Sequence, residues 1–164
     1  MILSRFADDF VVGFQHRGDA ERFLADLRGR FAEFGLELAA EKTRLIEFGR
    51  FAARDRGARG QRRPETFQFL GFTHICAKTR DGRFKLQRVT SKKRLQAKLS
   101  AVKTELRHRR HLPIPDQGRW LASVVQGHYN YYAVPDNIEA LRAFREQVIW
   151  RWHGRLCAAA NAHA

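Results

Sequence analysis

The sequence predicts an α+β fold with strands in the first part of the chain and only helices in the second. Segments 2–14 and 67–88 are rich in β-branched and aromatic residues, which favour strands. Each is interrupted by a short turn sequence, Ala7-Asp8-Asp9 or Asp81-Gly82, so each is predicted to form a β-hairpin. After Thr90, apolar residues recur at spacings of three and four, which places them on one face of a helix.

Between the two hairpins the sequence predicts one helix, two short strands and a loop. Aromatic and aliphatic residues at helical spacing indicate a helix over residues 18–35, with Asp19 as its N-cap and Gly35 ending it. Short strands are predicted at 36–38 and 42–48. Residues 49–65 combine many arginines with glycine and proline, which predicts a basic loop.

Three helices are predicted after residue 90. The first covers residues 91–110 and ends before two prolines that cannot continue it. Asp116 is expected to cap the second, and Pro135 lies near the start of the third. Residues 158–164 show no pattern and are expected to form a disordered tail. The expected domains are therefore 1–90 and 91–157, followed by that tail.

The strong positive charge predicts a polyanionic partner. The chain has 31 Lys and Arg against 17 Asp and Glu, which gives a formal net charge of +14 at pH 7. Nucleic acid is favoured because each neutralised phosphate releases condensed counterions. The alternatives are a merely solvated, arginine-rich surface and an anionic membrane. The membrane is disfavoured because no lysine-rich amphipathic helix stands out, and no run of eighteen apolar residues predicts a membrane span.

Asp8 and Asp9 place two carboxylates side by side between apolar strands. Neighbouring like charges repel, so folding alone does not explain the pair. Carboxylate oxygens are ligands that Mg²⁺ accepts, especially when substrate phosphates complete its coordination. The alternative is an ordinary turn, where Asp is common because its side chain bonds to nearby backbone.

Four blocks occur in the order and spacing of a known family. Arg5-Phe6-Ala7-Asp8-Asp9-Phe10-Val11-Val12 resembles the (Y/F)-x-D-D box of the reverse transcriptase palm. The next block of that family is similar to Gly35-Leu36-Glu37-Leu38 together with Glu41-Lys42-Thr43-Arg44-Leu45. The block after it is similar to Phe67-Gln68-Phe69-Leu70-Gly71-Phe72. The maturase domain is resembled by Gly118-Arg119-Trp120 and Gly127-His128-Tyr129-Asn130-Tyr131-Tyr132. The chain is thus similar to the C-terminal part of a bacterial group II intron-encoded reverse transcriptase/maturase.

The resemblance implies part of a reverse transcriptase palm, built of β-hairpins and a helix, followed by an all-helical thumb/maturase domain. It implies RNA-directed DNA polymerase activity by two-metal nucleotidyl transfer, with Mg²⁺ as the cofactor. It also implies a mobile-element protein of the bacterial cytoplasm. The implied partners are group II intron RNA, which the family binds and helps to splice, and an RNA template with a DNA primer.

The resemblance also assigns roles to single residues. Asp8 and Asp9 would be the catalytic metal ligands, and Lys42 would lie near the incoming triphosphate, although it could equally be a solvated charge. Phe6 stands where the family usually has Tyr, which keeps the ring and loses the hydroxyl. The residues expected to contact the nucleotide or the primer end are Phe6, Ala7, Phe69, Leu70 and Gly71.

A third set of residues is expected to contact nucleic acid through charge and stacking. Arginines of the basic loop and cations of the first helix after residue 90 would contact phosphates, and aromatic residues of the second helix would stack on unpaired bases. Trp120 and Tyr131 fit a core position better at their helical spacing. The full set is Arg50, Arg54, Arg59, Arg62, Arg63, Lys92, Lys93, Arg94, Lys98, Tyr129 and Tyr131.

The family also uses a further palm carboxylate and the fingers, both of which precede the (Y/F)-x-D-D box. Only seven residues precede Asp8, so an N-terminal fragment is expected to supply them, and polymerisation by this chain alone is expected to fail. The alternatives are a non-catalytic RNA-binding maturase module and a decayed remnant without activity.

Overall fold

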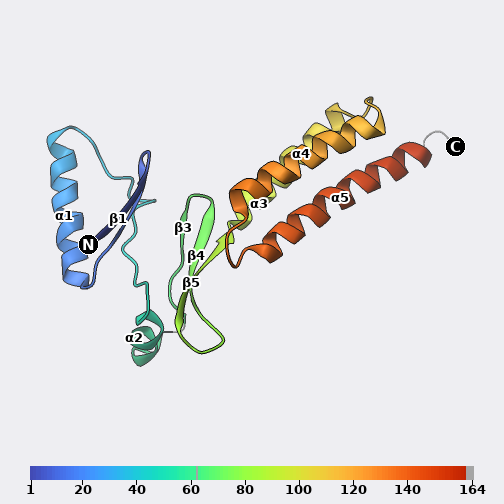
Figure 1. The fold of residues 1–164 in the computed structure, drawn as a ribbon. Coiled ribbons are helices and arrows are strands. Elements are labelled where there is room, and N and C mark those ends of the chain that lie inside the picture. The colour runs from blue at the N-terminus through green and yellow to red at the C-terminus, as the bar shows by residue number, and fades with distance from the viewer. Residues whose placement is uncertain (62, 162–164) are drawn as a thin grey trace. The chain divides into compact units, whose positions relative to one another are not determined.

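The computed structural model describes residues 1–61 and 63–161 and confirms the mixed α+β fold (Figure 1). It divides into two compact units. Unit 1 contains Met1–Leu70 and Cys76–Lys85, and unit 2 contains Gly71–Ile75 and Leu86–Ala164. The chain crosses between the units within two strands, so the boundary does not follow a single linker.

Unit 1 begins with the predicted hairpin. Strands β1 (Ile2–Phe6) and β2 (Asp9–Gly13) are antiparallel, and their register pairs Phe6 with Asp9. Only Ala7 and Asp8 therefore form the turn, and Ala7 has a positive φ of 52°. A two-residue turn of this kind matches the twist of the two strands.

Helix α1 (Arg17–Glu33) follows, one residue earlier at its start than the sequence predicts. Its N-cap is His16 and not Asp19, so the predicted cap is wrong. Asp19 instead lies in the first turn, where a carboxylate is favoured by the helix dipole, and it pairs with Arg22 at 2.5 Å. Gly35 has a φ of 66°, as expected of a glycine that ends a helix.

The next segment corrects two predictions. Residues 36–38 and 42–48 form no strand, because alternation alone cannot make a strand without a partner backbone to bond. A turn lies between them instead, where the N–H groups of Lys42 and Thr43 both donate to the carbonyl of Ala39. The predicted basic loop contains helix α2 (Ala52–Ala58), which the high helix propensity of Ala and Arg explains.

The second predicted hairpin is a three-stranded sheet. Its strands are β3 (Phe67–Phe69), β4 (Phe72–Lys78) and β5 (Phe84–Thr90), in the order β3-β4-β5. The predicted turn at Asp81-Gly82 separates β4 from β5. A second two-residue turn, Leu70-Gly71, separates β3 from β4, and both of its residues have positive φ angles of 50° and 77°.

Unit 2 contains three helices that lie along one another (Figure 1). They are α3 (Lys92–His108), α4 (Ile114–Tyr132) and α5 (Ile138–Asn161). Side chains from all three form one buried cluster, which consists of Leu99, Val102, Leu106, Leu121, Phe144 and Val148. The helical second part of the chain is therefore a packed bundle with its own core.

The ends of α4 and α5 differ from the sequence prediction. Pro113 and not Asp116 is the N-cap of α4, and the fixed φ of proline suits a helix start. Helix α5 continues to Asn161, which includes 158–161 of the predicted disordered tail. The alanines at 158–160 are the best helix formers and explain the extension. Residues 162–164 lie outside the described residues.

A buried asparagine joins the end of β5 to the turn before α5. Asn137 has no exposed surface. Its Oδ1 accepts the N–H of Thr90, and its Nδ2 donates to Thr90 Oγ1 and to the carbonyl of Tyr132, each at 2.8 Å. Because all these groups are satisfied, the polar side chain is tolerated in the interior.

Candidate catalytic hairpin and nucleic-acid-binding surfaces

The β1–β2 hairpin presents Asp8 and Asp9 at its exposed tip. Within the described residues neither carboxylate forms an ion pair, whereas Asp19, Asp55 and Asp116 each pair with an arginine. Arg5 lies beside the tip, but its Nε donates to the carbonyl of Ala7 at 2.9 Å. Both carboxylates are therefore available to a ligand, although the chain is strongly cationic.

The carboxylate oxygens at the tip are of the kind that Mg²⁺ binds. Mg²⁺ binds oxygen ligands and often takes only one or two carboxylates, with waters and substrate phosphates completing its coordination. Asp8 and Asp9 provide two such carboxylates. Among the described residues no group of three or more His, Cys, Asp or Glu side chains gathers at one place, so the pair would hold the ion together with substrate phosphates.

Of the other unit 1 residues predicted to contact the nucleotide, Phe6 and Ala7 lie at the hairpin tip and Lys42 lies in the turn after α1. Phe6 is 64% exposed at the end of β1, so its ring is open to a ligand. Ala7 forms the turn next to Asp8. Lys42 is exposed in the turn after α1, and in the described structure no hydrogen bond or ion pair joins it to either aspartate. Its role near a triphosphate stays a prediction.

Phe69 ends β3, Leu70 and Gly71 form the turn before β4, and in unit 2 the space beside Gly71 is occupied. A Cβ added to Gly71 would lie 2.8 Å from Oη of Tyr132. A glycine is thus required here by its positive φ and by the nearby side chain of Tyr132. Both reasons concern the folding of the chain and not the binding of a ligand. Contact of Phe69, Leu70 and Gly71 with a primer stays a prediction.

The arginines predicted to contact phosphates around α2 fall into two groups. Arg59 forms an ion pair with Glu47, and Arg54 pairs with Asp55 at 2.8 Å while its guanidinium lies 4.9 Å from the centre of the Phe51 ring. Arg50 also lies over Phe51, and Arg63 is exposed. Arg62 lies outside the described residues. Because exposed ion pairs contribute little, a phosphate can compete for these arginines.

Two glutamates restrain this segment in a way that the sequence did not indicate. Glu65 accepts hydrogen bonds from Arg44 and Arg56, each at 3.3 Å, and Glu47 pairs with Arg59. The three arginines come from different parts of the segment, so the two glutamates link residues 44–65 together. Part of the basic character predicted from composition is therefore neutralised within unit 1.

In unit 2, helix α3 presents a cationic face opposite its buried face. Leu99, Val102 and Leu106 point into the core. The exposed positions include all the cations of α3 that were predicted to contact nucleic acid, namely Lys92, Lys93, Arg94 and Lys98. A surface of this kind binds the phosphate backbone without reading its sequence.

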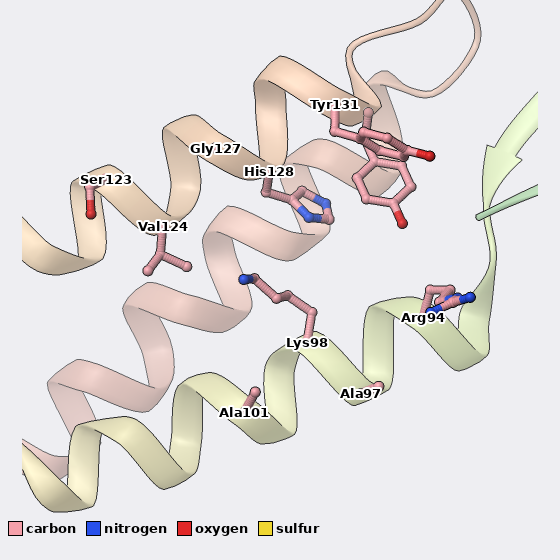
Figure 2. A pocket seen from close by; sticks show the side chains of 10 residues that line it. Arg94, Ala97, Lys98, Ala101, Ser123, Val124, Gly127, His128 and Tyr131 are labelled. Atoms are coloured by element: carbon pink, nitrogen blue, oxygen red, sulfur yellow. The ribbon is translucent and has the colours of Figure 1, made fainter. Parts of the chain in front are cut away.

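A groove runs between α3 and α4 (Figure 2). Its volume is about 640 Å³. The residues that line it are Arg94, Ala97, Lys98 and Ala101 of α3 and Ser123, Val124, Gly127, His128, Tyr131 and Tyr132 of α4. None of these ten residues is acidic, so the two cations give the groove a positive potential.

His128 is the most buried polar residue of the groove, with 5% of its surface exposed. Its ring centre lies 3.8 Å from that of Phe144 and 4.5 Å from that of Tyr132. Burial, and to a smaller extent the positive charge of Lys98, lower the pKa of His128 to about 4. The imidazole is therefore neutral at pH 7, and its buried Nε2 has no hydrogen-bond partner within the described structure.

The aromatic residues of α4 divide between the core and the surface. Trp120 packs against the core cluster, as its spacing predicts, and the guanidinium of Arg109 lies 4.9 Å from its ring centre. Tyr131 is 55% exposed, so the core position that its spacing favoured is wrong. Tyr129 is half-buried. Burial raises the pKa of Tyr132, with Tyr131 adding to the effect, so its hydroxyl stays protonated.

The groove brings together residues that the sequence indicated only separately. Lys98 was predicted as a phosphate contact, and His128 was one of several aromatic or basic residues of α4. Nothing in the sequence showed that the two face each other or that Gly127 and Ala101 leave open space between the helices. The i, i+4 spacing of the small residues Ala97 and Ala101, and of Ser123 and Gly127, is a signal that could have shown it.

Residues 1–74 match the family model described as reverse transcriptase (RNA-dependent DNA polymerase). The matched region contains the hairpin with Asp8 and Asp9, helix α1 and the turn at Leu70-Gly71. No curated protein and no solved structure matches the chain significantly. Within the described residues, every helix is too short or too polar to cross a membrane.

Proposed function

We propose that this chain is part of a group II intron-type reverse transcriptase/maturase, in which the β1–β2 hairpin belongs to the polymerase site and unit 2 binds RNA. The observation that best supports this proposal is the family match over residues 1–74. Within the described structure, the matched region contains two exposed carboxylates without an ion-pair partner at a hairpin tip. The order of the sequence blocks supports the narrower assignment to group II introns. The cationic face of α3 supports RNA as the ligand of unit 2.

The proposed chemistry uses the carboxylates at the tip. Asp8 and Asp9 would hold Mg²⁺, which would supply charge stabilisation for the attacking 3′-oxygen and the leaving pyrophosphate oxygen. The two residues place their carboxylates at adjacent positions of the hairpin tip, Asp8 in the turn and Asp9 at the start of β2. The ring of Phe6 lies at the end of the neighbouring strand, where it can pack against a bound nucleotide.

Metal binding at the tip can be tested without an assay of polymerisation. Mn²⁺ replaces Mg²⁺ at such oxygen sites and broadens the NMR signals of nearby nuclei. With a deoxynucleoside triphosphate present, we expect low Mn²⁺ concentrations to broaden the amide signals of Asp8 and Asp9 before those of Asp81. Asp81 is the matched control, because it also lies at an exposed hairpin tip. Equal broadening at both tips would refute a specific site.

RNA binding by the chain is tested by its salt dependence. We expect log K for a single-stranded RNA to fall linearly with log[salt], because binding releases counterions from the phosphates. The affinity is measured by fluorescence anisotropy at several salt concentrations. An RNA affinity that does not change with salt would contradict binding through phosphates.

Primer extension with Mg²⁺ distinguishes the catalytic role from the alternative of an RNA-binding module. The comparison is between the chain, Asp8→Asn and the control Asp26→Asn, each with an RNA template and a DNA primer. Extension that is lost in Asp8→Asn and kept in Asp26→Asn supports the catalytic role. Salt-dependent RNA binding without any extension, and without Mn²⁺ binding at the tip, favours the non-catalytic RNA-binding module.

A further inference from the structure

The groove between α3 and α4 combines positive charge, a buried hydrogen-bonding group and an exposed aromatic ring. We propose that it binds one unpaired nucleotide of an RNA strand, with a backbone phosphate held by Arg94 and Lys98 and the base against Tyr131. This inference rests on RNA being the ligand of unit 2 and goes beyond it, because it assigns a single site and the kind of strand that the site takes.

The first argument is the unsatisfied nitrogen of His128. The ring lies against Phe144 and Tyr132, so it cannot turn toward water without losing these contacts. A buried polar atom without a hydrogen bond costs about 1–3 kcal/mol, and proteins usually supply a partner. Figure 2 shows Lys98 of α3 and His128 of α4 both extending into the space between these two helices. Nε2 has almost no accessible surface, so a ligand in the groove would supply the missing partner once the lining side chains shift.

The second argument is the charge of the lining. Arg94 and Lys98 are exposed on α3, and the groove contains no carboxylate that would pair with them. A phosphate between the two cations would gain charge-assisted hydrogen bonds. Because the pKa of His128 is about 4, its imidazole adds no positive charge at neutral pH and serves as a neutral hydrogen-bonding group.

The third argument is the available space. Ala97 and Ala101 on α3 have short side chains, and a Cβ added to Gly127 would meet no atom within 4 Å. The volume of about 640 Å³ lies in the usual range for small-ligand pockets, which is suitable for one nucleotide. Tyr131 lines the same groove and is 55% exposed, so an unpaired base can stack on its ring.

The neutral imidazole favours RNA over DNA. The ribose 2′-hydroxyl can donate and accept a hydrogen bond. It can therefore pair with a ring nitrogen of the neutral imidazole in either tautomer, whether that nitrogen donates or accepts. DNA lacks this group and leaves Nε2 of His128 unsatisfied. We therefore expect a single-stranded RNA to bind more tightly than the DNA of the same sequence, with a preference on the order of tenfold from one buried hydrogen bond.

The test uses the full chain and a fluorescein-labelled single-stranded 12-nucleotide RNA, with the DNA of the same sequence and an RNA duplex as further ligands. Lys98→Ala should weaken binding to the single-stranded RNA by about tenfold and reduce the salt slope by about 1. The matched control is Lys103→Ala, because Lys103 is also exposed on α3 but does not line the groove. It should weaken binding by about twofold, as expected of a diffuse charge effect.

Two further variants test the groove itself. Ala101→Trp fills it from an exposed position and should weaken single-stranded RNA binding while leaving duplex binding unchanged. His128→Phe keeps the ring contacts and should remove the preference for RNA over DNA. Circular dichroism and thermal unfolding establish that each variant is folded, and His128→Leu, which also lacks hydrogen-bonding groups, replaces His128→Phe if the latter is not.

The outcomes separate this inference from the proposed function. If the chain binds RNA with a normal salt slope, but Lys98→Ala equals Lys103→Ala and Ala101→Trp has no effect, the groove is not the site and the proposed RNA binding stands. If the single-stranded DNA binds as tightly as the RNA, the assignment to RNA is overturned. If the chain does not bind RNA at all, the groove site and the proposed RNA binding of unit 2 both fail.

Discussion

Gly71 illustrates how a single residue is required by two independent features of unit 2. Its φ of 77° lies in the region that L side chains rarely adopt, and Oη of Tyr132 would lie 2.8 Å from an added Cβ. A positive φ costs a non-glycine residue roughly 1–2 kcal/mol. The contact with Tyr132 adds to this, because its ring is held by Phe72 and His128.

We expect Gly71→Ala to lower the free energy of unfolding by about 2–3 kcal/mol, measured by urea denaturation. The matched control is Gly82→Ala, since Gly82 has a φ of 78° and open space beside it. The control should cost only about 1–2 kcal/mol from backbone strain. Equal losses in the two variants would show that Tyr132 yields without cost.

His128 should make unit 2 sensitive to acid. The unfolded imidazole titrates near 6.5 and the folded one near 4, so below pH 6.5 the unfolded chain binds more protons. The contribution of His128 is fully present above this pH and is lost as the pH falls toward 4. Between pH 7 and pH 5 the loss is about 2 kcal/mol.

The pH dependence is measured as the free energy of unfolding of the wild-type chain and of His128→Phe at pH 7, 6 and 5. The wild type should lose about 2 kcal/mol more than the variant over this range. The variant removes one titrating group and leaves the other histidines and the carboxylates as they are. If the two proteins lose the same free energy of unfolding between pH 7 and pH 5, the pKa of His128 is not lowered in the folded state.

At the scale of elements, Asn137 joins β5 to the start of α5. Its side chain makes three hydrogen bonds of 2.8 Å to Thr90 and Tyr132. These bonds hold the ends of two helices and one strand at a single point. The helices therefore depend on a buried polar contact as well as on the apolar core.

Asn137→Ala should lower the stability of the bundle by about 3 kcal/mol, because it leaves buried groups of Thr90 and Tyr132 unsatisfied and creates a small cavity. Asn130→Ala serves as the control, since Asn130 is an exposed residue of α4 that bonds only to Gln126. The control should change the stability by no more than about 0.5 kcal/mol. The stability of both variants is measured by thermal unfolding. If Asn137→Ala loses no more stability than Asn130→Ala, Asn137 does not have this structural role.

At the scale of the whole molecule, the two units differ in how much apolar surface they bury. Among the buried apolar residues in the part of the chain that the structure describes, only Ala20 and Ala52 belong to unit 1, and the others lie in unit 2. In unit 1, Ile2, Leu3 and Phe6 of the first hairpin are all more than half exposed. A segment with few buried contacts opens locally at low free energy.

We therefore expect amide hydrogen exchange to be slowest in α3, α4 and α5 and much faster in β1, β2 and α1. Mass spectrometry of peptic fragments at neutral pH measures both regions in one experiment. A difference of at least about a hundredfold corresponds to roughly 3 kcal/mol in opening free energy. Equal protection in both units would show that the hairpin is stabilised by contacts that its exposure does not reveal.

Much of this arrangement follows from local sequence. The turn residues at 7–9 and 81–82 and the apolar spacing after Thr90 predicted the first hairpin, the β4–β5 turn and the three helices. Local patterns failed where a partner was required. Residues 42–48 alternate like a strand but find no strand to bond, and α2 forms in a segment whose arginines and glycines suggested a loop.

The sequence by itself determined the α+β order of the chain, its positive charge and the exposed carboxylates of Asp8 and Asp9, because turn chemistry, periodicity and charge are local properties. Only the tertiary structure decided that Tyr132 fills the space beside Gly71, that Asn137 bonds to Thr90, and that Lys98 and His128 line one groove. Each of these pairs is distant in sequence, and only packing of the helices brings its members together.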